Sequence, residues 1–135
     1  MRATTPSAPR LGILWFGIQA VWGALLGISL QARSIELVAS QPLLAYGRLA
    51  TTGAVVAAIV QIVVGPLSDA RRRRGGKRIE FYVGGAVLGA IAIWTFYDAS
   101  TFGALTIAYV CLQGTLNFAI GPYQAVIPDA IPRER

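Results

Sequence analysis

The chain contains 135 residues, of which 55% are apolar and only 13% are charged, and its net charge is +6. A water-soluble domain of this size needs more polar surface, so this composition excludes an ordinary soluble globular protein and indicates a membrane protein. The sequence has no histidine and one cysteine, Cys111. A disulfide framework is therefore excluded, and we expect no metal site and no cofactor.

Four stretches of the chain lack any Asp, Glu, Lys or Arg: residues 11–32, 49–68, 81–97 and 99–128. Crossing a hydrocarbon core of about 30 Å takes about 20 helical residues, and about 17 are tolerated. Backbone groups in lipid must be hydrogen-bonded within their own segment, which favours helices. The sequence predicts an all-α, polytopic membrane protein with one membrane domain over residues 1–135 and four transmembrane helices, over about 11–31, 44–66, 80–97 and 102–127.

The first predicted helix carries a polar residue near its middle. Its apolar run exceeds the about 7 to 15 residues of a signal-peptide core, so we expect it to remain as a helix. Gln19 lies there with Trp15 and Trp22 at helical spacing on one face. The pair Gly23 and Gly27 predicts close packing against another helix.

The second predicted helix has a cation near its outer end and a Gly-Pro pair at the other. Arg48 lies about one turn inside the outer end, where its side chain can reach the interface; binding of an anionic substrate is the alternative. Gln61 is expected to contact another helix or the interface. Gly65 is expected to let another helix approach closely, and Pro66 is expected to end or bend the helix.

A strongly basic loop follows, reading SDARRRRGGKR from residue 68 to residue 78. Clustered cations suit a nucleic-acid backbone. This loop lacks interleaved aromatic residues and a recognition helix, and membrane spans hold both of its ends, so we expect no nucleic acid partner. Cytoplasmic loops are ordinarily basic and can gather anionic lipid. The single carboxylate in the loop, Asp69, is expected to be ionised and paired.

The distribution of cations predicts the orientation of the chain. The two termini and the basic loop hold ten Lys and Arg residues, whereas the opposite side holds only Arg33 and Arg48. Under the positive-inside rule, both termini then lie in the cytoplasm.

The third and fourth predicted helices carry a small-residue pair and an amide pair. Gly85 and Gly89 predict close helix packing. Gln113 and Asn117 lie one turn apart near the middle of the fourth helix. Polar groups in lipid face the bundle interior or a wet cavity, and amides beside indoles suit a polar solute such as a sugar. The alternative is that these amides only bond neighbouring helices. The candidate residues of a substrate path are Gln19, Trp22, Gln113 and Asn117.

The middle third of each predicted span lacks Asp, Glu, Lys, Arg and His, which argues against ion coupling within this segment. No nucleophile with a neighbouring base and no phosphate-binding loop is present, so we do not expect an enzyme.

Two motifs resemble those of a known family. The G-x-x-x-D pattern at Gly65 and Asp69, followed by a basic loop with glycine, resembles the loop between helices 2 and 3 of the major facilitator superfamily, in the form seen in sugar-cation symporter-like members. The segment over residues 117–132 is similar to the N-x-x-x-G-P-Y-x-A-x-x-P-D-x-x-P segment of the same members. With the four helices, the resemblance covers essentially the whole chain.

The resemblance implies a secondary transporter with twelve helices in two halves, which binds a small polar or amphiphilic solute between the halves and works by alternating access. This chain would correspond to its first four helices, in the cell membrane. Its partners would be the lipid bilayer, the solute, and the missing C-terminal helices or a second chain. The resemblance also implies that the chain is truncated before a fifth helix and is inactive alone.

Roles for individual residues follow from the same resemblance. Gly65 would be the close-contact position and Asp69 the gate carboxylate, and the implied gating loop further contains Arg71, Arg72, Arg73, Arg74, Gly76, Lys77 and Arg78. The second motif contains Asn117, Gly121, Pro122, Tyr123, Pro128 and Asp129.

Two other functions remain open at the level of sequence. One is a four-helix structural or regulatory membrane subunit that does not transport. The other is a small exporter in which two copies form one pore.

Overall fold

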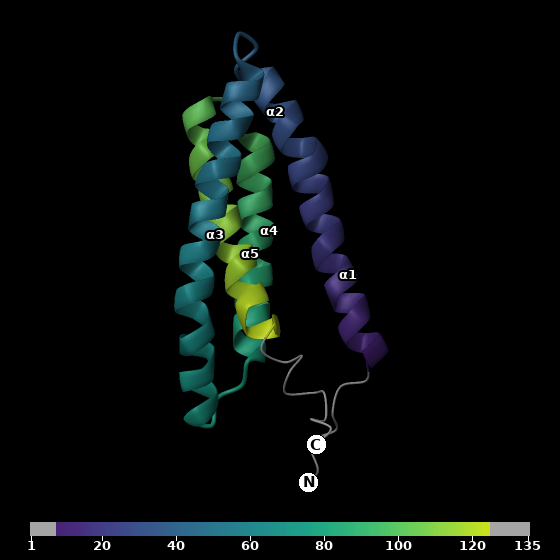
Figure 1. Cartoon of the computed structure of the whole chain (residues 1–135), viewed down its shortest axis with the longest axis vertical. Coiled ribbons are helices and arrows are strands. Elements are labelled where there is room, and N and C mark those ends of the chain that lie inside the picture. The colour runs from purple at the N-terminus through teal and green to yellow at the C-terminus, as the bar shows by residue number, and fades with distance from the viewer. Residues whose placement is uncertain (1–7, 125–135) are drawn as a thin grey trace.

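The computed structural model describes residues 8–124, and every element in that range is a helix (Figure 1). The first helix consists of α1 (Ala8–Ala24), the π-helical segment η1 (Leu25–Ser29) and α2 (Leu30–Leu37); it is followed by α3 (Pro42–Arg73), α4 (Ile79–Asp98) and α5 (Phe102–Gln124). Four helices are long and apolar enough to cross a membrane: Trp15–Leu37, Pro42–Arg73, Ile79–Asp98 and Phe102–Gln124. The predicted fold class is confirmed, because the chain is all-α with four helices able to span a membrane.

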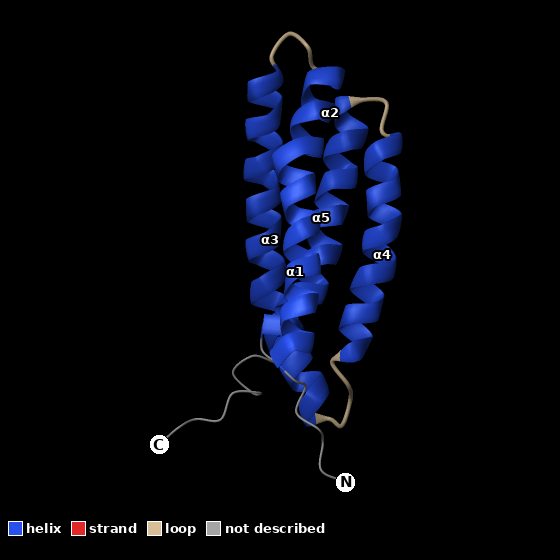
Figure 2. Cartoon of the chain, turned by 90° about the vertical axis from the view of Figure 1, so that its right-hand side faces the viewer, coloured by secondary structure: helices blue, strands red, loops and turns tan. Residues whose placement is uncertain are grey.

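The helices run along one long axis and are joined by short loops (Figure 2). The beginning of α1, the end of α5 and the loop between α3 and α4 lie at the same end of the bundle (Figure 1). We call this the basic end, because it holds the cations of residues 71–78.

The second transmembrane helix is longer than the sequence predicts. The expected range was 44–66, whereas α3 continues through Pro66 to Arg73, about two turns further. Pro66 costs the helix one backbone hydrogen bond, but the following Leu, Ala and Arg residues favour helix strongly enough to continue it. The 32 residues of α3 rise about 48 Å, more than a hydrocarbon core of about 30 Å, so its last turns extend beyond the membrane interior.

The end of α3 is set by glycine rather than by proline. Gly75 has a φ of 80°, a conformation that residues with a side chain rarely adopt. The amide of Gly75 donates to the carbonyl of Arg72, and the amide of Gly76 donates to the carbonyl of Arg71, both at 3.0 Å. This pair of bonds is a Schellman motif, which satisfies the last carbonyls of the helix.

Small residues bring the central helices together. A Cβ atom at Gly85 of α4 would lie 2.7 Å from the Cβ of Ala119 and 2.9 Å from the carbonyl oxygen of Thr115 on α5. The predicted close packing at Gly85 and Gly89 is therefore present between α4 and α5. The buried core of the bundle includes Leu25, Leu30, Leu49, Phe96, Leu105, Tyr109 and Leu112.

The first helix differs from the prediction in length and in packing. It was expected over 11–31 and reaches Leu37, and α1 leans away from the other helices toward the basic end (Figure 1). Gly23 and Gly27 have no neighbouring atom within 4 Å of a built Cβ, so they do not form the expected close contact in the described part of the chain. The helix is held by a hydrogen bond of 2.6 Å between the hydroxyls of Ser29 and Tyr97.

The remaining ranges agree more closely with the sequence. The helix expected over 80–97 is α4, Ile79–Asp98, and the helix expected from residue 102 is α5. The expected end at residue 127 lies outside the described residues.

Candidate functional site

Three polar side chains lie on one face of α5. Tyr109, Gln113 and Asn117 are spaced four residues apart, so they project from the same side of the helix. All three are buried, with exposed fractions of 0%, 5% and 3%. Gln113 is the central residue of α5, which places the group near the middle of the membrane.

These side chains form one chain of hydrogen bonds with Gln61 of α3. The Gln113 amide donates to the Tyr109 hydroxyl oxygen at 2.7 Å, and the Asn117 amide donates to the Gln113 backbone and side-chain carbonyls at 2.8 and 3.2 Å. Gln61 then donates to the Asn117 side-chain oxygen at 2.8 Å. We call these four residues the amide cluster. Gln61 is therefore a helix contact, and the length of α3 places it away from the helix end.

Gly53 of α3 makes room for the amide cluster. A Cβ atom at this position would lie 2.7 Å from the Gln113 nitrogen and 2.7 Å from the Tyr109 ring and hydroxyl. Any larger residue would push the two polar side chains out of place.

The amide cluster borders an open groove of about 310 Å³. The groove is lined by Trp22 and Leu26 of the first helix, by Tyr46, Ala50, Ala54 and Ala57 of α3, and by Tyr109, Gln113 and Asn117 of α5. Its lining contains no ionisable carboxylate or amine, and its polar groups are amides and phenols. Such a lining suits an uncharged solute that forms hydrogen bonds and presents an apolar face to the indole and the alanines.

The structure brings together three of the four residues expected on a substrate path. Trp22, Gln113 and Asn117 line the same groove. Gln19 does not join them; it is exposed on α1 and lies outside the groove. Gln19 shares a face with two tryptophans that do contact or approach the bundle, but its own side chain stays exposed in the described structure.

At the basic end, ion pairs among the described residues connect α3 with the beginning of α4. Asp69 accepts a hydrogen bond from the Arg78 guanidinium at 2.6 Å, and Arg71 donates to both Glu80 carboxylate oxygens at 3.0 and 3.2 Å. The predicted pairing of Asp69 is therefore present, and its partner is Arg78. The Arg71 side chain passes over Gly76, where a Cβ would lie 2.6 Å from its Nε.

The other cations of the predicted gating loop lie at the surface of the described structure. Arg72, Arg73, Arg74 and Lys77 are exposed. This exposure leaves them accessible to water or to lipid headgroups.

Gly65 faces open space, whereas Gly121 contacts α3. No atom lies within 4 Å of a Cβ built at Gly65, so no described helix fills the position predicted for close approach. A Cβ at Gly121 would lie 3.4 Å from a methyl group of Val64. Pro122 and Tyr123 are buried, and Tyr123 stacks on Trp15 with a ring separation of 5.9 Å. Pro128 and Asp129 of the second motif lie outside the described residues.

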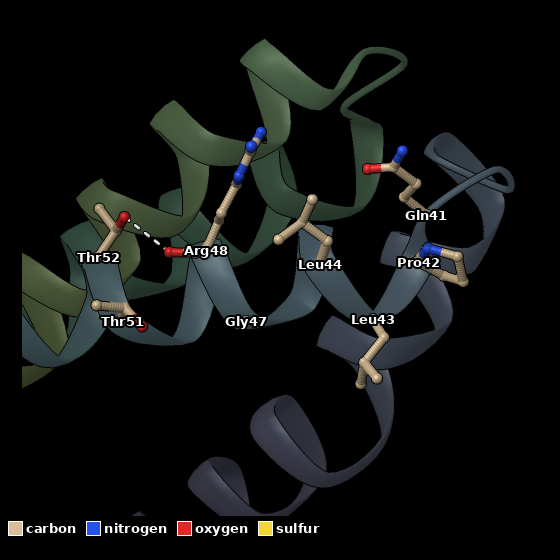
Figure 3. A pocket seen from close by; sticks show the side chains of 8 residues that line it. All are labelled: Gln41, Pro42, Leu43, Leu44, Gly47, Arg48, Thr51 and Thr52. Carbon is tan, nitrogen blue, oxygen red and sulfur yellow. Dashed lines mark hydrogen bonds between the residues drawn. The ribbon is translucent and has the colours of Figure 1, made fainter.

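Arg48 lies beside a larger but open hollow at the outer end of α3. The hollow has a volume of about 890 Å³ and is lined by residues of α3 and of the loop before it. Figure 3 shows Arg48 and Gln41 extending from one side of this helix and Leu43 from the other, with the Thr52 hydroxyl bonded to the Arg48 carbonyl at 2.8 Å. Arg48 is exposed, in keeping with a side chain that reaches the interface.

Two members of the site were not predicted from sequence, Tyr109 and Gly53. The spacing from Tyr109 through Gln113 to Asn117 could have predicted that Tyr109 joins the two amides, because residues four apart share a helix face. Gly53 gave no comparable signal, since its role depends on which side chains of α5 it faces.

The described residues contain no group of His, Cys, Asp or Glu side chains that could hold a metal ion. No protein-family model, curated protein or solved structure matches the chain.

Proposed function

We propose that this chain is the N-terminal, four-helix part of a secondary transporter of the major facilitator type, located in the cell membrane with its termini in the cytoplasm. The solute is small, uncharged and polar or amphiphilic, and it is carried by alternating access. The amide cluster beside the open groove is the observation that carries this proposal.

The position of the cluster supports a water-filled path. Amides and a phenol at the middle of a membrane are costly if they face hydrocarbon, so they ordinarily face protein or a wet cavity. The four groups use only part of their hydrogen-bonding capacity on one another, because an amide nitrogen has two protons and an amide oxygen has two lone pairs. The remaining capacity is available to water or to a solute in the groove.

The open faces of the bundle support additional helices. The groove is open on one side, and Gly65 has free space above its backbone on α3. Further transmembrane helices, from the same transporter or from a second chain, would close the groove and pack at Gly65.

Cysteine accessibility tests for the water path. In a Cys111→Ala background, Ala54→Cys places a thiol on the groove, and Val55→Cys places one on the neighbouring lipid-facing position, which is 54% exposed. In cells expressing the full chain, a membrane-impermeant thiosulfonate should modify Ala54→Cys and leave Val55→Cys unmodified. If both thiols are unreactive, the groove is dry, and a subunit without transport activity becomes the better explanation.

Solute flux tests the role of the cluster. Uptake of uncharged sugars and polyols by cells or liposomes containing the chain and its co-purifying partners should be lost in Gln113→Leu and kept in Gln19→Leu. The two variants carry the same substitution, but only Gln113 lies on the groove. Equal flux in both variants, or no flux above protein-free vesicles for any solute, would contradict the proposal.

A further inference from the structure

A second cavity lies between the leaning helix α1 and the pair α4 and α5. Its volume is about 380 Å³, within the range of sites that enclose small molecules. It occupies the half of the bundle toward the basic end, since Tyr82 and Ala86 come from the beginning of α4 and Tyr123 comes from the end of α5. Trp22 lines both this cavity and the groove, so the two spaces are neighbours.

The lining of this cavity is almost entirely apolar. Gly17, Trp22, Ala86 and Leu116 are typical members, and no Asp, Glu, Lys or Arg lines it. Among the lining side chains a charged ligand finds no group of opposite charge to offset its lost hydration, so the lining favours an uncharged molecule.

One polar group at the cavity lacks a partner. The Tyr82 hydroxyl oxygen is buried and makes no hydrogen bond within the described structure, although Tyr82 lines the cavity. A buried hydroxyl without a partner is unfavourable, and buried polar groups in folded proteins are usually satisfied. A ligand that brought one hydrogen-bond acceptor to this hydroxyl would remove the deficit.

We propose that this cavity is a binding site for an uncharged, largely apolar molecule with one hydrogen-bond acceptor, such as an aryl ketone, which accepts from the Tyr82 hydroxyl. The site does not depend on transport, because its lining excludes the amide cluster of the proposed solute path.

Prodan, an uncharged naphthalene ketone whose emission depends on polarity, is a suitable probe. Trp22 and Trp15 lie at or near the cavity, whereas Trp94 is 76% exposed, so the purified full chain is prepared with Trp94→Phe. Energy transfer from tryptophan to prodan should then saturate with probe concentration and exceed that in protein-free micelles. A signal that only rises linearly with probe concentration, as in protein-free micelles, would overturn the proposal.

Two leucine substitutions on α1 locate the site. Gly17 lines the cavity, Gly23 does not, and a Cβ at either position meets no atom within 4 Å. Gly17→Leu should abolish saturable binding and Gly23→Leu should leave it unchanged, with equal helicity of both variants by circular dichroism. Equal binding in the two variants would show that the probe binds elsewhere.

Removal of the hydroxyl tests the hydrogen bond. Tyr82→Phe should weaken prodan binding about fivefold, the effect of one neutral hydrogen bond, and should shift its emission toward shorter wavelength. An analogue with an alkyl group in place of the ketone should bind wild type and Tyr82→Phe equally. Equal prodan affinity in wild type and Tyr82→Phe would overturn the assignment of Tyr82.

Discussion

Gly53 and Gln113 meet at the middle of the membrane, where a small error in packing exposes polar groups to an apolar surrounding. The absence of a side chain at Gly53 allows the Gln113 amide to reach the Tyr109 hydroxyl. This contact couples the packing of α3 against α5 to the hydrogen bonds of the amide cluster.

Gly53→Ala should therefore destabilise the protein. The added methyl group would lie 2.7 Å from Gln113 and Tyr109 and would force both away, at a cost of about 1 to 3 kcal/mol. The free energy of unfolding in mixed detergent micelles would measure this effect. Gly47→Ala on the same helix is the control, because it meets no atom within 4 Å and should be neutral or slightly stabilising. Equal stability of the two variants would show that α3 and α5 do not pack at Gly53.

Part of the amide cluster could be predicted from sequence because helical spacing is a local property. Gln113 and Asn117 share a face whatever surrounds them, and polar groups in a span tend to turn inward. Gln19 satisfied the same local conditions, yet it is exposed. Its environment depends on the lean of α1, which no local pattern specifies.

At the scale of elements, the junction between α3 and α4 combines a glycine stop with two ion pairs. The Schellman motif at Gly75 and Gly76 turns the chain so that Arg78 meets Asp69 and Glu80 meets Arg71. The sequence predicted that Asp69 would be paired, but six cations stand close to it along the chain. Which of these cations pairs with Asp69 depends on the angle of this turn, so the sequence alone did not predict Arg78 as the partner.

Gly75→Ala should weaken the junction. A residue with a side chain pays about 1 to 2 kcal/mol in the left-handed conformation that Gly75 adopts. Thermal unfolding would show the loss. Gly84 on α4 has a regular helical backbone, and a Cβ built there meets no atom within 4 Å, so Gly84→Ala should not lower stability. If both variants lower stability equally, the loss at Gly75 does not come from its left-handed conformation.

Asp69→Asn should have a small effect on stability but a measurable coupling to Arg78. The Asp69 side chain is 46% exposed, so solvent screens the pair and its coupling energy should not exceed about 1 kcal/mol. A double-mutant cycle of Asp69→Asn with Arg78→Gln would measure it. The matched cycle of Asp69→Asn with Arg73→Gln should give a coupling near zero, since Arg73 is exposed; equal couplings would mean that Asp69 responds only to the net charge of the loop.

At the scale of the whole molecule, the uncharged runs predicted the number of spans and the composition of each. They did not predict the length of α3, because the run ends at Ser68 while the helix ends at Arg73. Hydropathy reports where hydrocarbon ends, whereas helix length depends on capping. The sequence also did not predict the tilt and packing of the first helix, since these depend on contacts among residues far apart in the chain.

The distribution of charge predicts that the basic end faces the cytoplasm. Single cysteines in a Cys111→Ala background test this orientation, with Lys77→Cys in the basic loop and Ser40→Cys in the loop at the opposite end. Both positions are exposed. In intact cells an impermeant maleimide should label Ser40→Cys alone. Labelling of Lys77→Cys alone would show that the basic end faces the outside of the cell.

The π-helical segment Leu25–Ser29 changes which residues of the first helix share a face. A π turn closes its hydrogen bond over five residues where an α turn closes over four, so it accommodates one extra residue. Each residue of an α-helix advances about 100° around the axis. The two parts of the helix are therefore out of phase, and a helical wheel drawn through Trp22 does not continue through Leu30. The extra residue in the π turn between Trp22 and Leu30, more than the polarity of the residues on either side, decides which faces of the helix meet the bundle.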